Sequence, residues 1–247
     1  MKTTYLILLS GLLSITLFVG CKNKEESNKK AVELLQKGKD AIDNHLYYQA
    51  IDYFKKSLEE NPDNADTHYY MGEAYKKNED YSDAIQCYNK AIEINPKDEY
   101  SCNGLAVSYQ LLGNYSEAIK NYQKSIEINP NNAYSYGNMG YVYNNLHNEE
   151  EALRCYFKAI EIDPNYVMIY DNIGCIYCDY YHDYKTAILY FQKAIKLAPY
   201  SGSPYFNIGV VYHKLGYKNK AFELYKMAAK LGYKEAINYL ADVGYNY

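Results

Sequence analysis

Two cysteines one helical turn apart give the sequence its most suggestive chemical spacing. Cys175 and Cys178 form a Cys-x-x-Cys pair, as in thiol–disulfide redox sites. Those sites place the pair at the start of a helix that follows a strand, where the helix dipole lowers the thiol pKa. Here the pair falls in the middle and at the end of a predicted helix. We therefore interpret both as ordinary helix-face cysteines, with a strained disulfide in an oxidising compartment as the alternative.

The other residues that could carry chemistry form no active-site motif. The histidines are His45, His68, His147, His182 and His213. No two of them have the i, i+4 spacing of a zinc-protease helix, and no cysteine pairs with them at zinc-finger spacing. The sequence also lacks G-x-S-x-G, P-loop and G-x-G-x-x-G motifs, which mark hydrolases and nucleotide-binding folds. We expect no catalytic residue, no metal site and no cofactor, and therefore no enzyme.

The charge distribution argues against a nucleic-acid partner. The formal net charge is −4, and lysines are interleaved with glutamates throughout. No long basic block is present, although such a block is the electrostatic footprint of nucleic-acid binding.

The sequence contains a repeat of 34 residues, which predicts the helices that carry these side chains. Its period is marked by Pro62, Pro96, Pro130 and Pro164, and by Pro199 one residue later. In the copy from Ala65 to Asp98, apolar residues recur at helical spacing on both sides of the turn Asn78-Glu-Asp80. Asn95-Pro96 ends the second helix, because proline disfavours the α conformation of the residue before it. Each copy is therefore predicted to be a helical hairpin, and a fixed period of this length predicts stacked hairpins.

Small and aromatic residues line up across six copies. The small residue of the first helix is Gly38, Gly72, Ala106, Gly140, Gly174 or Gly209, and the aromatic residue of the second helix is Phe54, Tyr88, Tyr122, Tyr156, Phe191 or Tyr225. These columns resemble the tetratricopeptide repeat family, whose antiparallel helix pairs stack into a right-handed superhelix. The resemblance implies an all-α fold, a right-handed superhelical solenoid of about six hairpins plus a C-terminal capping helix.

The repeat period divides the chain. The six repeats are assigned to residues 31–64, 65–98, 99–132, 133–166, 167–201 and 202–235, followed by a capping helix and tail at 236–247. The first copy is atypical, which fits a terminal repeat with one face in solvent. The fifth copy carries one extra residue, which we place in the turn at 180–183.

The N-terminus has the pattern of a targeting segment. Lys2 precedes an apolar run from Tyr5 to Val19, which is shorter than the roughly 20 residues of a membrane span and fits a signal peptide over residues 1–20. Residues 21–30 are polar, and we expect a flexible tether there.

Phe18-Val19-Gly20-Cys21 resembles the bacterial lipobox. The resemblance implies that Cys21 carries lipid, including palmitate, and that the protein is a membrane-anchored lipoprotein of a bacterial cell envelope, on its periplasmic or cell-surface face. An uncleaved anchor or an ordinary secretory peptide is the alternative.

A surface is then the remaining candidate site. In the tetratricopeptide family the first helices line a concave groove. Its candidate residues here are Tyr70, Tyr100, Asn103, Asn138, Tyr141, Asn172 and Asn207. Asn138, Asn172 and Asn207 share one column, and an amide can both donate to and accept from a peptide backbone. The alternative for this column is packing between repeats.

We therefore predict a non-catalytic protein-interaction scaffold that binds a peptide or protein partner in its groove. The alternative is a structural component of an envelope complex that acts through its convex face or by self-association.

Overall fold

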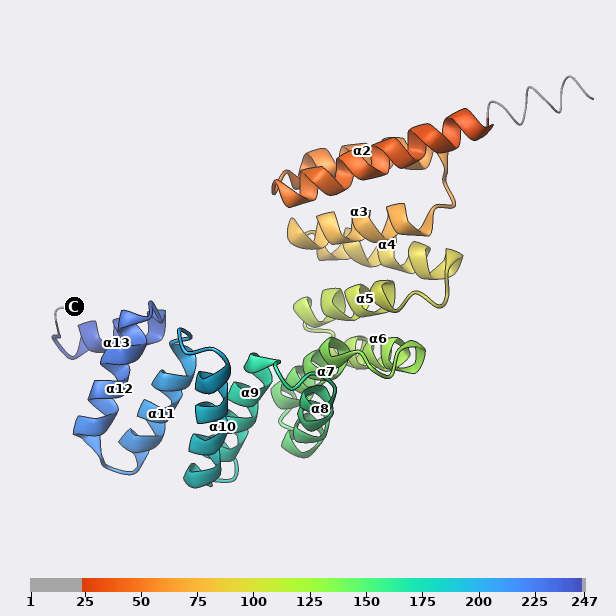
Figure 1. Ribbon diagram of the computed structural model, residues 1–247. Coiled ribbons are helices and arrows are strands. Elements are labelled where there is room, and N and C mark those ends of the chain that lie inside the picture. Colours follow the sequence, from red (N-terminus) through yellow and green to blue (C-terminus); the bar gives the residue numbers. More distant parts are fainter. Residues whose placement is uncertain (1–23, 246–247) are drawn as a thin grey trace, which may run out of the picture. The chain divides into compact units, whose positions relative to one another are not determined.

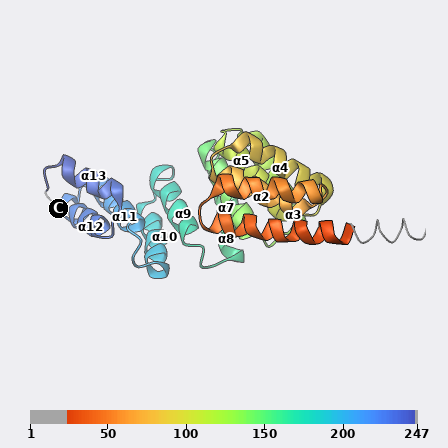
Figure 2. The ribbon, with the colours of Figure 1, turned by 90° about the horizontal axis from the view of Figure 1, so that it is seen from above.

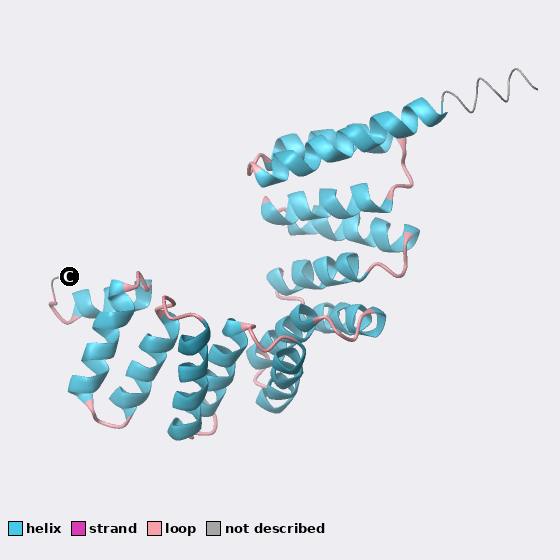
Figure 3. Ribbon diagram, in the orientation of Figure 1, coloured by secondary structure: helices cyan, strands magenta, loops and turns pink. Residues whose placement is uncertain are grey.

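The computed structural model describes residues 24–245. Within this range every regular element is a helix, and short loops join the helices (Figure 3). The predicted signal peptide and Cys21 lie outside the described residues.

The helices form six hairpins and one additional helix, as predicted. Residues 24–43 form the first helix. The others are α2 (Tyr47–Glu60), α3 (Ala65–Lys77), α4 (Tyr81–Ile94), α5 (Glu99–Leu111), α6 (Tyr115–Ile128), α7 (Ala133–Asn145), α8 (Glu149–Ile162), α9 (Val167–Asp179), α10 (Tyr184–Leu197), α11 (Ser203–Lys214), α12 (Lys218–Lys230) and α13 (Lys234–Asp242). The predicted all-α repeat solenoid is confirmed, and the capping helix α13 begins two residues before the predicted boundary at 236.

The chain separates into two compact units, Met1–Ile128 and Asn129–Tyr247. In each unit the two helices of a hairpin run side by side and antiparallel (Figures 1 and 2). Each unit holds three hairpins, and α13 closes the second unit.

Side chains at the helix starts explain why the hairpins begin where they do. The Asn64 side chain accepts from the backbone N–H of Thr67 at 2.9 Å, and the Asn132 side chain accepts from that of Ser135 at 3.1 Å. Each bond satisfies a backbone donor that the first turn of a helix leaves unpaired.

The column of small residues lies where the two helices of a hairpin cross. A Cβ atom built on Gly140 would stand 2.7 Å from the ring of Tyr156, and one built on Gly174 would stand 2.5 Å from the ring of Phe191. Tyr156 and Phe191 are themselves buried. The small residues thus allow close approach of the two helices beside large aromatic side chains.

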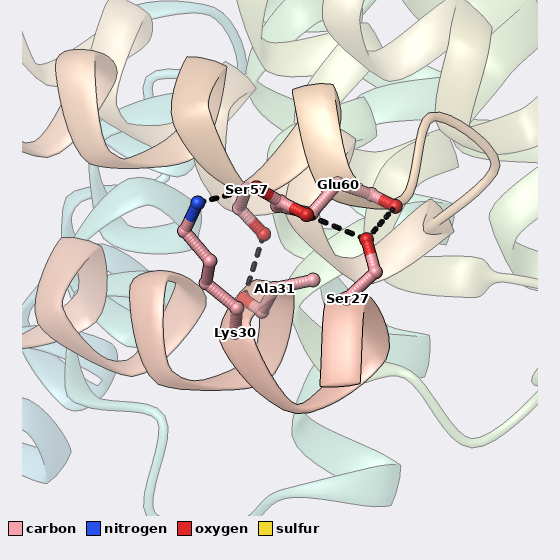
Figure 4. Close-up of polar contacts among 5 residues, drawn as sticks. All are labelled: Ser27, Lys30, Ala31, Ser57 and Glu60. Atoms are coloured by element: carbon pink, nitrogen blue, oxygen red, sulfur yellow. Dashed lines mark hydrogen bonds and ion pairs between the residues drawn. The ribbon is translucent and has the colours of Figure 1, made fainter. Parts of the chain in front are cut away.

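The prediction of a flexible tether at 21–30 is wrong for residues 24–30, which continue the first helix (Figure 4). Ser27 donates to the Glu60 carboxylate at 2.5 Å, and the Lys30 ammonium donates to it at 2.6 Å. Behind them the buried Ser57 hydroxyl donates to the carbonyl of Ala31 at 2.8 Å. Polar contacts to the end of α2 therefore hold a segment that contains no aliphatic residue.

Candidate functional site

The first helices of successive repeats face one another within each unit. α3 contacts α5, and α9 contacts α11, whereas successive second helices make no comparable contact among the described residues. The first helices therefore form the inner face of each unit.

On the inner face of the first unit, tyrosines gather. The rings of Tyr69 and Tyr70 meet edge to face at 5.0 Å, and the Tyr69 ring lies 6.4 Å from that of Tyr100. Tyr100 is 63% exposed, and the ammonium of Lys39 lies 3.9 Å from the centre of the Tyr70 ring. The structure thus brings the predicted Tyr70 and Tyr100 together through Tyr69, and we call these three residues the tyrosine cluster. Asn103 lies half-buried on α5.

Glu73 lies under the tyrosine cluster. It accepts from the buried Tyr88 hydroxyl at 2.5 Å and forms an ion pair with Lys76 at 2.6 Å. Burial, and then the nearby Glu73 carboxylate, raise the pKa of Tyr88 well above its usual value. The Lys76 ammonium compensates the Glu73 charge.

On the inner face of the second unit, polar bonds tie α9 to α11. Asp171 accepts from the Asn207 amide at 2.9 Å and from the Ser203 hydroxyl at 2.5 Å. Lys214 and Asp179 form an ion pair at 2.6 Å near the other end of these helices. Burial raises the pKa of Asp171, and the two hydrogen bonds oppose that shift. The Asn207 amide therefore makes a contact between the fifth and sixth repeats.

The other members of that column differ from Asn207. Asn138 and Asn172 are half-buried, and Tyr141 is 46% exposed beside them. No hydrogen bond occupies the Asn138 side chain among residues 24–245. Its amide can still donate to and accept from a bound backbone.

α7 and α9 are close at their N-terminal ends and separate toward their C-terminal ends. The rings of Tyr134 and Tyr166 lie 5.1 Å apart, and a Cβ built on Gly137 would stand 2.9 Å from Ile169. At the other end a pocket of about 470 Å³ opens. It is lined by Asn144, Asn145, His147, Glu149, Cys175, Ile176, Asp179 and Tyr180. The sequence analysis did not identify this pocket.

The Cys-x-x-Cys pair lies on α9 as two free thiols. Burial raises the pKa of Cys175 to about 12 and that of Cys178 to about 11. Both thiols are therefore protonated near neutral pH, whereas a thiol nucleophile must be ionised. This agrees with their interpretation as ordinary helix-face cysteines. The described part of the chain also contains no group of three residues placed to hold a metal ion.

Models of the tetratricopeptide repeat match residues 65–98, 100–132, 133–166 and 203–231. Together the matched segments cover more than half of the chain. The chain belongs to the tetratricopeptide repeat family. The first and fifth repeats, which no model matches, are nevertheless helical hairpins.

Solved structures of other tetratricopeptide-type proteins have the same fold. PilF from Pseudomonas aeruginosa has a TM-score of 0.74 at 15% identity, over 88% of this chain and 99% of that one. The MamA protein has a TM-score of 0.61 at 24% identity, over 68% and 92%. YrrB, described as a TPR protein with an unusual peptide-binding site, has a TM-score of 0.57 at 22% identity, over 72% and 91%. No curated protein sequence matches the chain.

None of the helices between residues 24 and 245 is both long enough and apolar enough to cross a bilayer.

Proposed function

We propose that the chain is a non-catalytic scaffold whose inner faces bind an extended segment of a protein partner. The tyrosine cluster carries the proposal. Tyr100 leaves most of its ring in solvent on a face that packing does not cover. Tyrosine gives large contact area with little loss of rotamer freedom and is enriched at interfaces.

The second unit supplies groups that suit a peptide backbone. The half-buried Asn138 and Asn172 can pair with backbone N–H and C=O groups of any sequence. The related fold of YrrB, whose description includes a peptide-binding site, supports peptide binding by a protein of this fold.

A pull-down from native envelopes with cross-linking tests this function. The test variant combines Tyr100→Ala, Asn138→Ala and Asn172→Ala, and it spares the structural Asn207. The control combines Tyr48→Ala with Tyr200→Ala, because these tyrosines are 75% and 87% exposed on α2 and in a loop. We expect partners that the control retains and the test variant loses. Identical partners in both would contradict binding through the inner faces.

We also propose that the scaffold is a lipoprotein anchored in a bacterial envelope through Cys21. The positively charged start, the apolar run and the cysteine at residue 21 support this. Cys21→Ala should abolish precursor processing and release the protein from the membrane fraction. Unchanged processing and partitioning would rule out the lipid anchor.

Self-association is a second candidate function. Leu189 of α10 is 57% exposed and Met227 of α12 is 47% exposed, so the second helices offer apolar side chains outside the inner face. Sedimentation over a range of concentrations tests it. A mass that rises with concentration, and that Leu189→Glu restores to the monomer, would favour assembly.

A further inference from the structure

The last two hairpins carry an excess of positive charge. The chain as a whole has a net charge of −4, but residues 184–234 contain nine lysines and a single acidic residue, Glu223. Their formal net charge is therefore +8 (nine minus one), and the rest of the chain carries −12 (−4 minus 8). Among residues 24–245, ion pairs take up only two of these lysines. Lys214 pairs with Asp179 at 2.6 Å, and Lys226 pairs with Glu223 at 2.7 Å.

One column of the repeat shows where the charge changes sign. Near the end of the second helix, the first four repeats carry a glutamate and the last two carry a lysine. The residues of this column are Glu59, Glu93, Glu127, Glu161, Lys196 and Lys230. In the second and fourth repeats the glutamate pairs with a lysine three residues earlier, at 3.0 Å for Lys90 and 2.8 Å for Lys158. In the fifth repeat Lys193 is followed by Lys196 instead, so this ion pair cannot form.

The unpaired lysines gather on the outer side of α10 and α12. Both helices are second helices of their hairpins and pack against α11 in the second unit (Figure 1). In α10 the exposed residues Lys185, Leu189, Lys193 and Lys196 are spaced by three or four residues and share one side of the helix, and in α12 Met227 and Lys230 do the same. Leu189 is 57% exposed and Met227 is 47% exposed. We call these six residues the lysine face.

The composition of the lysine face suits an anionic bilayer. All nine cations of residues 184–234 are lysines, and arginine, whose planar fork recognises individual phosphates and carboxylates, is absent from this segment. Lysines gain electrostatic energy near an anionic membrane surface without a fixed geometry. The apolar Leu189 and Met227 lie among the lysines, and such mixed faces bury their apolar side chains at the boundary between headgroups and acyl chains.

We propose that the lysine face docks on the surface of a bilayer that contains anionic phospholipids. The inference goes beyond the proposed function, because it uses the outer helices in place of the inner faces and does not require a lipid on Cys21. Charge complementarity supplies the attraction, so docking should weaken as salt screens the charges.

Lysine footprinting on the full chain tests the docking directly. Protein with Cys21→Ala, which removes the proposed acylation site, is mixed with vesicles of phosphatidylcholine alone or of phosphatidylcholine with phosphatidylglycerol. An acetylating reagent then marks the accessible lysines, and mass spectrometry reads each one. This readout separates the lysine face from any binding through the apolar run at residues 5–19.

The expected result is local protection. Lys193, Lys196 and Lys230 should become protected by the anionic vesicles, not by the neutral ones, and high salt should remove the protection. Lys97 and Lys124, which are exposed in the first unit, should stay reactive throughout. Protection of all five lysines, of none, or equally by neutral vesicles would overturn the proposal.

A charge-reversal variant restores the residue that the first four repeats have. Lys196→Glu with Lys230→Glu should weaken partitioning onto anionic vesicles by more than about tenfold, measured by flotation. The matched control is Lys97→Glu with Lys124→Glu, which changes the net charge equally and should retain binding. Equal losses in both variants would contradict a local site. A lower melting temperature of the first variant with undiminished binding would show that these lysines only stabilise their helix ends, and would also contradict the proposal.

A third variant tests the apolar part of the lysine face. Leu189→Ser with Met227→Ser leaves the charge unchanged and should weaken binding to anionic vesicles several-fold, because it removes apolar area. Unchanged binding would contradict docking at the headgroup boundary. Single-stranded DNA or polyglutamate that protects the lysine face where anionic vesicles do not would overturn the proposal in favour of a soluble polyanion.

The pull-down keeps this inference separate from the proposed function. Vesicle binding that survives Lys196→Glu and Lys230→Glu would refute the lysine face and leave the scaffold function intact. Partners that survive the combined Tyr100, Asn138 and Asn172 variant would refute binding through the inner faces and leave the lysine face intact.

Discussion

Gly140 shows how one residue fixes the distance between the helices of a hairpin. Its missing side chain lets α7 approach the ring of Tyr156, and a single added carbon would already stand 2.7 Å from that ring. Gly140→Leu should therefore lower the free energy of unfolding by about 1–3 kcal/mol, because the core cannot take the extra volume without strain. Thermal denaturation measures the effect.

The neighbouring position provides the control for that prediction. Tyr141 is 46% exposed on the same helix, so Tyr141→Leu adds a leucine that meets solvent and should change stability by less than about 0.5 kcal/mol. Equal losses in both variants would mean that the crossing column is wrongly assigned.

At the scale of the element, the turn between the two helices of a hairpin has a fixed conformation. One position of this turn has a positive φ in several repeats. It is occupied by Glu79 (66°) and His147 (55°), and by the glycines Gly113 (75°) and Gly216 (83°). Left-handed backbone is costly for residues with a Cβ and free of that cost for glycine. Glu79→Gly should therefore stabilise the protein by about 0.5–1 kcal/mol, with Gly113→Ala destabilising it by a similar amount. Chemical denaturation of the two variants checks the opposite signs.

The capping helix is a second device at this scale. Leu240 and Ala236 of α13 are 0% exposed, and they pack with Tyr225 and Ala228 of α12. Leu240→Ala should cost about 2–5 kcal/mol, since it leaves a cavity in this cluster. Because repeats contact only their neighbours, hydrogen exchange should accelerate in α11 and α12 and stay unchanged in α3 and α4. A uniform increase along the chain would contradict this local response.

At the scale of the whole molecule, the 34 tyrosines determine how the stability of the fold changes at high pH. Burial raises the pKa of Tyr69, Tyr88 and Tyr156 above the ordinary value of 10.0. The unfolded state therefore loses these protons first, so the stability they contribute is complete below pH 10 and is lost as the pH rises above it. Tyrosinate absorbance from these side chains should appear together with the loss of helical circular dichroism. Tyr88→Phe should flatten the fall of stability above pH 10, and an unchanged slope would contradict the argument.

The periodic features of this chain could be predicted, and the irregular ones could not. The contact between Gly140 and Tyr156 has an equivalent in four other copies, so its column was visible in the sequence. The helix at 24–30 depends on Glu60, more than 30 residues away, and local composition gave no sign of that contact. The pocket at the C-terminal ends of α7 and α9 depends on the separation of two helices, which no local sequence pattern shows.

Because the first helix already begins at Lys24, the distance between Cys21 and the first repeat is short. Three peptide links join Cys21 to Lys24, and consecutive Cα atoms are at most about 3.8 Å apart, so these two Cα atoms lie within roughly 11 Å of one another. A lipid on Cys21 would therefore hold the start of the first helix close to the headgroup layer of the membrane. A partner would have to approach the bilayer surface to meet that repeat, because the scaffold could not extend outward to capture it.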